Sequence, residues 1–174
     1  MRLIQRNEDI YDSYINANYI NTSISRNDQL FIATQGPLET TIQNFWRMVD
    51  QERVSLVVML THLKEHTKVK CHQYWPSQVW ENESDSGIPY DENKEVLLVS
   101  VESLMPNLIK RRLQLTQKDD SGAVVQMRIV TQLQYLTWPD FGVPEEQDYK
   151  IIGTIIEHMQ QHHWGKRGRE SSLD

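Results

Sequence analysis

A short loop that holds one acid between two prolines constrains this chain more than any other stretch. Residues 138–145 read WPDFGVPE and directly follow a strand-like segment. Pro139 and Pro144 have a locked φ and no N–H, and Gly142 reaches dihedral angles closed to other residues, so a helix or a central strand is excluded here. The segment is therefore a shaped loop that presents Asp140 instead of burying it in a strand ladder.

Two explanations of this loop are compatible with its own residues. In one, Trp138 and Phe141 anchor a surface loop and Asp140 only caps the following helix. In the other, Asp140 is presented as a proton donor. The rest of the chain favours the second, because further motifs precede the loop in a fixed order: YINAN at residues 14–18, TQGPL at 34–38, FWRMV at 45–49 and KCHQYWP at 70–76.

Together these motifs resemble those of the classical tyrosine-specific protein phosphatases, from about Asp12 to the end of the helix near His163. The resemblance implies an α/β (α+β mixed sheet) fold, in which a twisted mixed β-sheet is flanked by helices. It implies one partial catalytic domain over residues 1–174, which stops before the phosphate loop of the family. The basic residues that follow the last expected helix indicate that 164–174 form a mobile tail.

The resemblance also implies the chemistry, which is hydrolysis of phosphotyrosine in proteins through a cysteinyl-phosphate intermediate. In the family the loop closes over bound phosphotyrosine, and its aspartate protonates the leaving phenolate. Asp140 is therefore the expected general acid, and Trp138 and Pro139 are expected to support it. Two further positions match supporting residues: Glu65, expected to orient the arginine of the phosphate loop, and Lys70, expected near the closed acid loop. Without the resemblance, an alternative interpretation stays open, in which Lys64 and Glu65 lie at a surface hairpin tip and are simply solvated.

The nucleophile that the family requires is not found in this chain. Family members carry a Cys-x5-Arg phosphate loop downstream of the acid loop, and the sequence reaches Asp174 without one. Cys71 is the single cysteine, but Ser77 stands where the arginine is needed, and no glycine lies between them. A phosphate loop needs backbone N–H groups that converge at a helix N-terminus. Cys71 is thus expected to be a small buried apolar residue, and the polypeptide alone is expected to be inactive and only marginally stable.

An alternative of another class stays open, namely a non-catalytic phosphatase-like module that binds phosphotyrosine or a partner protein. The intact WPD triplet of residues 138–140 counts against it, because a dead domain has no need of the acid. The sequence indicates neither the specific substrate nor the oligomeric state.

Composition narrows the class of protein. With 174 residues, 39% of them hydrophobic and 24% charged, the chain suits one globular domain and is too polar for a membrane span. One cysteine excludes an internal disulfide and favours a reducing location, cytoplasmic or the cytoplasmic portion of a larger protein. The net charge of −6 argues against nucleic acid as a partner. The basic run at 110–112 is expected to be a solvated sheet face.

Two pairs of histidines at i, i+4 spacing are the candidate metal ligands. His158 and His162 fall on an expected helix, off its apolar stripe and without an evident third ligand, so a solvated face is favoured. His62 and His66 follow a strand, where this spacing carries little meaning. We expect no metal and no cofactor.

Hydrophobic periodicity predicts the elements. Strands are expected at 30–34, 55–61, 96–105 and 108–116, a helix at 38–53 with Phe45 and Trp46 as core anchors, and a polar loop at 78–94. After a turn at 118–122, an alternating strand runs into Trp138, with the apolar residues Val125, Met127, Ile129, Leu133 and Tyr135 on one side. A helix is expected at 146–163, with an apolar stripe made of Tyr149, Ile152, Ile156 and Met159.

Overall fold

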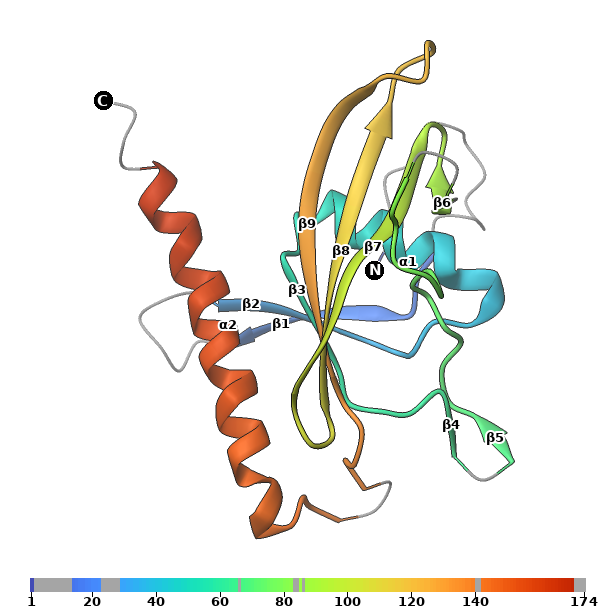
Figure 1. Cartoon of the computed structure of the whole chain (residues 1–174). Helices are drawn as coiled ribbons and strands as arrows, with labels where there is room; N and C mark the ends of the chain where they lie inside the picture. Colours follow the sequence, from blue (N-terminus) through green and yellow to red (C-terminus); the bar gives the residue numbers. More distant parts are fainter. Residues whose placement is uncertain are drawn as a thin grey trace.

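The computed structural model describes residue 1 and residues 14–22, 29–65, 67–82, 85, 87–139 and 142–170 (Figure 1). A five-stranded mixed sheet forms the centre of this part of the chain, in the order β3-β9-β8-β7-β6. Its strands are β3 (Leu56–Met59), β6 (Ile88–Asp91), β7 (Lys94–Met105), β8 (Leu108–Lys118) and β9 (Val124–Tyr135). The neighbouring pairs are antiparallel except β3 and β9, which run parallel. The mixed α/β sheet expected from the sequence is confirmed.

Two small hairpins and two helices complete the described fold. The hairpins are β1 (Ala17–Thr22) with β2 (Gln29–Thr34), and β4 (Lys64–Glu65) with β5 (Lys68–Val69). A 3₁₀ turn, η1 (Glu39–Thr41), leads into α1 (Ile42–Gln51), and a second, η2 (Glu146–Asp148), leads into α2 (Tyr149–Glu170). In Figure 1 the two helices lie on opposite sides of the sheet.

The strand alternation explains why each face of the sheet receives one helix. Along β9, Val130 joins the cluster around α1, which includes Phe45 and Trp46. Leu133 and Tyr135 have the opposite parity and pack with Ile151 and Ile155 of α2 in the second cluster. Successive side chains of a strand point to opposite faces, so a single strand serves both cores.

Tight turns hold the long strands in register. Asn93 (φ 56°) and Asn107 (φ 66°) occupy the short connections from β6 to β7 and from β7 to β8, because asparagine tolerates the left-handed region better than most residues. In the turn between β8 and β9, Oδ1 of Asp119 accepts hydrogen bonds from the backbone N–H groups of Ser121 (2.9 Å) and Ala123 (3.0 Å).

One arginine ties the end of α1 to the sheet. Arg128 of β9 donates from Nη1 to the carbonyl of Val54 and from Nη2 to that of Val49, each at 2.7 Å, and its Nε lies 3.3 Å from Oδ1 of Asp50. Burial raises the pKa of Asp50, but the nearby cations Lys94 and Arg128 outweigh it and hold the pKa below the usual range. The carboxylate is therefore charged and fixes the helix end.

Several element predictions are corrected. The segment 78–94, expected as a loop, contains β6 and the first residue of β7, because Ile88 pairs with Val96. The last helix continues to Glu170 instead of ending near His163, so residues 164–170 are helical. Residues 171–174 lie outside the described part.

The apolar stripe of α2 was also assigned wrongly. Ile151 and Ile155 are the buried residues, at 5% and 6% exposure, whereas Tyr149 and Ile156 are exposed at 59% and 47%. Met159, by contrast, packs against the second cluster as expected. The buried stripe starts two residues later than Tyr149, because the sheet selects which face of the helix it covers.

The exposed half of β9 shows a limit of the alternation rule. Val125, Met127 and Ile129 share the parity of Leu133 and Tyr135, as predicted. They are exposed at 57%, 63% and 37%, because α2 covers only the later part of the strand. A common face does not by itself imply a common burial.

Candidate active site

Parallel pairing brings two sequence-predicted segments to one edge of the sheet. β3 and β9 leave the sheet in the same direction, with Met59 opposite Gln134. β3 then leads to the β4–β5 hairpin, and β9 leads to Trp138, both at the lower end of the sheet in Figure 1. Ligands are bound preferentially where the carboxyl ends of parallel strands meet. This edge is the candidate site.

The acid loop begins directly at the end of β9. Trp138 is exposed at 37% and stands edge-on to Tyr135, with 6.0 Å between the ring centroids. Pro139 is half-buried and Pro144 is buried, while Gly142 has the positive φ of 102° that its residue type permits. Asp140 and Phe141 lie outside the described residues. The loop is thus anchored on its flanks in the described part of the chain.

The motifs 14–18 and 34–38 contact each other. Nδ2 of Asn16 donates to Oε1 of Gln35 (2.9 Å), and the hydroxyl of Thr34 donates to the carbonyl of Asn16 (3.2 Å). Motif 34–38 also contacts motif 70–76, since the backbone N–H of His72 donates to the carbonyl of Pro37 (2.8 Å). Segments that looked separate along the sequence therefore form one structural unit.

Close packing explains the glycine of motif 34–38. A Cβ at Gly36 meets Cβ of Cys71 at 2.9 Å and the carbonyl of Lys70 at 3.0 Å, closer than normal contact. We expect Gly36→Ala to destabilise the chain by about 1–3 kcal/mol, because a backbone atom and a buried side chain must move. Gly153→Ala is the matched control: nothing lies within 4 Å of its Cβ, and alanine favours the helix by about 0.5–1 kcal/mol. Urea denaturation measures both, and equal midpoints contradict the packing argument.

Cys71 has the structural role expected from the sequence. Its side chain is 1% exposed, and burial raises the pKa of the thiol to about 11. The thiol lies 3.2 Å from the carbonyl of His72, to which it donates. A protonated, buried thiol is a poor nucleophile.

Alkylation tests this assignment of Cys71. At pH 8 iodoacetamide should modify the native chain at least about 100-fold more slowly than the chain unfolded in guanidinium chloride, because both the thiolate fraction and access are reduced. Mass spectrometry over time gives both rates. Similar rates contradict a buried, protonated thiol.

The two supporting residues predicted from the resemblance lie together. Nζ of Lys70 is 3.2 Å from Oε2 of Glu65, so the pair joins the last residue of β4 to the residue that follows β5. Both side chains are partly buried, at 32% and 22% exposure, so Glu65 is paired and not simply solvated as in a free hairpin tip. Lys64 is exposed. Their position relative to Asp140 lies outside what the described residues define.

A buried cation near this edge was missed by the sequence analysis. Arg111 was expected on a solvated sheet face, but it is 9% exposed and its guanidinium lies 4.3 Å from the ring centroid of Trp75. Its Nη1 donates to Oε1 of Gln132 (3.0 Å) and of Gln134 (2.9 Å). Burial lowers the pKa of Arg111. Arg111 and the buried Leu113 are two residues apart on β8, so their side chains point to the same face of the sheet. This alternation was the sequence signal that could have predicted a buried Arg111.

The two glutamines extend this network to the edge of the sheet. Nε2 of Gln132 donates to the hydroxyl of Tyr74 (2.6 Å), and Nε2 of Gln134 donates to the carbonyl of Thr61 (3.0 Å). Gln134, four residues before Trp138, thereby fixes the end of β9 to the segment that follows β3. A buried network whose polar groups are hydrogen-bonded to one another favours one conformation of the strand end.

Among the residues that the structure describes, no group of three His, Cys, Asp or Glu side chains is placed to hold a metal ion. His158 and His162 are both half-buried, on the side of α2 that carries Ile151 and Ile155, and not on a solvated face as expected. His66 lies outside the described residues. The described helices include none with the length and apolar character of a membrane span.

Comparison with known proteins gives a consistent result. The family model of the protein-tyrosine phosphatases matches residues 2–172. Tyrosine-protein phosphatase non-receptor type 4 of Mus musculus is 41% identical over 166 residues, which are 94% of this chain and 16% of that protein. Receptor-type tyrosine-protein phosphatase alpha of Homo sapiens is 38% identical over 138 residues, 79% of this chain and 16% of that protein.

Solved structures agree with this result. The catalytic domain of human protein tyrosine phosphatase non-receptor type 18 superposes with a TM-score of 0.66 and 31% identity, over 83% of this chain and 46% of that one. A second structure, on the fingerprint of PTPN18 on distinct HER2 tyrosine phosphorylation sites, gives 0.71 and 28% over 92% of this chain and 51% of that one. The chain thus spans about half of the solved domains and a small part of the full-length relatives.

Proposed function

Because this chain belongs to the protein-tyrosine phosphatase family, we propose that it forms the acid-loop part of a catalytic domain that hydrolyses phosphotyrosine in proteins. The observation that carries the proposal is the parallel pairing of β3 with β9, which brings the Glu65–Lys70 hairpin and the segment leading to Asp140 to one edge of the sheet. A cytoplasmic location, expected from the single cysteine, is part of the same proposal.

The proposed reaction has two displacements at phosphorus. A cysteine thiolate attacks phosphorus and the bond to the phenolic oxygen breaks, while Asp140 gives its proton to that oxygen. Water then attacks the cysteinyl phosphate, Asp140 accepts a proton from the water, and inorganic phosphate and the thiolate are released. Tyrosine has a pKa of about 10, so phenolate leaves poorly without this proton, and a placed acid contributes about 10²- to 10⁴-fold.

Asp140 must keep its proton to act in the first step. A free aspartic acid has a pKa of about 3.9 and is ionised at neutral pH. Apolar surroundings and a nearby dianionic substrate both raise the pKa of a carboxyl group. Trp138, packed edge-on to Tyr135, supports an apolar flank for the loop.

The nucleophile of this scheme is supplied from outside the 174 residues. Cys71 is the single cysteine of the chain, and its burial and raised thiol pKa support its exclusion from the reaction. We therefore propose that this chain by itself does not turn over phosphotyrosine. A Cys-x5-Arg loop completes the site, its arginine is oriented by Glu65, and Lys70 lies near the closed acid loop.

A chimera tests this function. Residues 1–163 are joined to the region that follows the matching helix in mouse non-receptor type 4, a relative at 41% identity. We expect the chimera to hydrolyse a phosphotyrosyl peptide, and the 174-residue chain to release no phosphate above the buffer rate. Replacing the phosphate-loop cysteine of the chimera with serine should abolish turnover and leave peptide binding intact.

Each outcome has a definite meaning. A folded chimera that binds phosphotyrosyl peptide without hydrolysing it overturns the enzyme and favours the binding module. Turnover by the 174-residue chain overturns the proposed need for an added nucleophile. If that turnover disappears in Cys71→Ser, the exclusion of Cys71 is wrong as well.

A further inference from the structure

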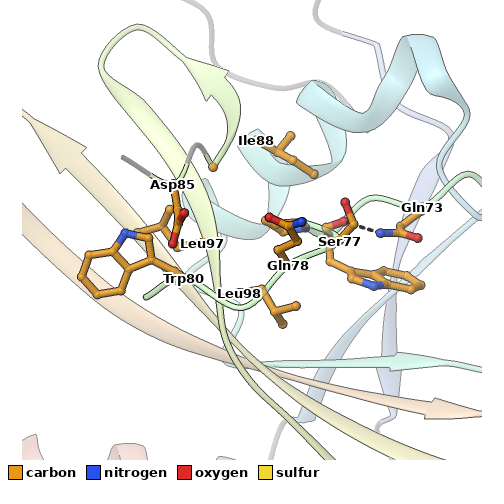
Figure 2. Close-up of a pocket in the computed structure, with 11 residues that line it drawn as sticks. Gln73, Ser77, Gln78, Trp80, Asp85, Ile88, Leu97 and Leu98 are labelled. Carbon is orange, nitrogen blue, oxygen red and sulfur yellow. Dashed lines mark hydrogen bonds between the residues drawn. The ribbon is translucent and has the colours of Figure 1, made fainter. Parts of the chain in front are cut away.

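A cavity of about 420 Å³ lies away from the acid loop, between the segment after Cys71 and strands β6 and β7 (Figure 2). Its apolar wall is made by Ile88, Leu97 and Leu98. Neither Trp138 nor Pro139 of the acid loop lines it. Leu97 and Leu98 are 6% and 3% exposed. The volume falls in the lower part of the range of about 300–1,000 Å³ typical of ligand sites.

The wall is fixed by hydrogen bonds and close packing. The backbone N–H of Trp80 donates to the carbonyl of Leu98 (2.7 Å), and Nε2 of Gln73 donates to the carbonyl of Trp75 (3.0 Å), as drawn in Figure 2. A Cβ at Gly87 would lie 2.6 Å from the carbonyl of Val96, so the backbone passes directly against β7. The cavity is therefore a defined feature of the loop and strand packing.

One tryptophan on this wall stays open to solvent. Trp80 is 38% exposed although its backbone is tied to β7. Figure 2 shows its indole beside Asp85 and near Leu97. Oδ2 of Asp85 accepts hydrogen bonds from the backbone N–H groups of Glu81 (2.8 Å) and Asn82 (3.2 Å), which hold the carboxylate against the two residues that follow Trp80. An exposed aromatic ring and a carboxylate on the same cavity wall favour a cation.

The charge at the cavity wall is that of one carboxylate. Asp85 is the only charged residue among those that line it in the described structure. Glu95 lies close to the wall, since its Oε2 would be 2.9 Å from a Cβ at Gly87, and it pairs with Lys118 at 2.5 Å. The guanidinium of Arg111 lies 4.3 Å from the ring centroid of Trp75, another lining residue, but it is only 9% exposed. The carboxylate of Asp85 is therefore the charge that a ligand in the cavity meets, and it favours a cationic group.

We propose that this cavity docks one arginine or lysine side chain from an extended basic segment of a partner protein. The alkyl stem of that side chain lies against Leu97 and Ile88, and the cation lies between the indole of Trp80 and the carboxylate of Asp85. The amides of Gln73 and Gln78 at the rim bind the backbone of the segment. This docking is separate from the proposed phosphotyrosine site and does not depend on it.

Calorimetric titration with two blocked peptides tests the docking. One carries two arginines between leucines, and the matched peptide carries glutamates in their place. We expect the arginine peptide to bind and the glutamate peptide not to bind. Binding should weaken as salt is raised, because the contact is electrostatic and partly exposed.

Charge-matched variants make the test specific. Asp85→Asn keeps the acceptor for the two backbone N–H groups, removes the charge, and should weaken binding about 3- to 10-fold. Asp120→Asn removes the same charge from the exposed β8–β9 turn and should change binding less than about twofold. Gln78→Lys, at an exposed rim position, puts a cation at the mouth without a folding cost and should also weaken binding.

Equal effects of Asp85→Asn and Asp120→Asn overturn the proposal, as does equal binding of the glutamate peptide. No binding of the arginine peptide also overturns it, provided that a melting curve shows the titrated chain to be folded. If Asp85→Asn does not fold, Gln78→Lys decides alone, and unchanged binding in that variant rejects the site.

Discussion

Replacing Asp140 with alanine in the active chimera is expected to lower kcat for a phosphotyrosyl peptide by about 10²- to 10⁴-fold and to leave KM nearly unchanged. The acid acts on the leaving oxygen only as the bond to phosphorus breaks, so its loss raises the barrier without removing a binding contact. Steady-state kinetics from about pH 5 to 8 measure the change. The parent chimera should lose activity as the pH rises through the pKa of the acid, and the variant should lack this decline.

The dependence on the leaving group separates acid catalysis from a loss of structure. An aryl phosphate whose phenol is a strong acid needs little protonation, so Asp140→Ala should cost much less on that substrate than on phosphotyrosine. Asp120→Ala, in the exposed turn between β8 and β9, is the control and should leave kcat unchanged. An equal loss on both substrates, or an unchanged kcat in Asp140→Ala, contradicts the assignment.

Trp46→Ala is expected to destabilise the chain by about 3–5 kcal/mol, the cost typical of removing a large aromatic side chain from a core. Trp46 is fully buried, stands edge-on to Phe45 at 5.3 Å, and donates from Nε1 to the carbonyl of Tyr74 (2.6 Å). It therefore joins α1 to motif 70–76. Domains are stable by only about 5–15 kcal/mol, so this variant should be largely unfolded if the chain is marginal.

Two controls apportion the effect of Trp46. Trp46→Phe keeps most of the ring but leaves the carbonyl of Tyr74 without its donor, and should cost about 1–3 kcal/mol beyond its lost volume. Val125→Ala, at 57% exposure on the uncovered part of β9, should change stability by less than about 0.5 kcal/mol. Urea midpoints compare the three. A Trp46→Ala midpoint near that of Val125→Ala contradicts the role of Trp46 as an anchor.

Local patterns predicted those parts of the fold that depend on local chemistry. The helix with Phe45 and Trp46 on its buried face is confirmed. Its apolar residues recur at helical spacing on one face, and such a helix buries that face against the core. The strands from 96 to 116 are confirmed by their alternation, and Cys71 by the absence of any feature that would activate it. The order of the motifs was sufficient to place the chain in its family.

Long-range packing decided what local patterns predicted wrongly. Arg111 follows Lys110 and precedes Arg112, so its sequence neighbours suggested solvent, yet strand parity turns it inward to Gln132 and Gln134. The covered face of α2 is set by the sheet beneath it, which selects Ile151 and Ile155. Neither choice is visible in a window of neighbouring residues.

The sequence by itself excluded a helix or a central strand over residues 138–145, because proline and glycine restrict the backbone wherever they stand. The order of the motifs also led to the prediction of Asp140 as the acid, which stays a prediction. Only the tertiary structure showed that the Glu65–Lys70 pair and the start of this loop leave the sheet at one edge, because β3 and β9 pair in parallel. Pairing between residues 75 apart, such as Leu56 and Thr131, depends on the packing of the whole sheet and not on either strand alone.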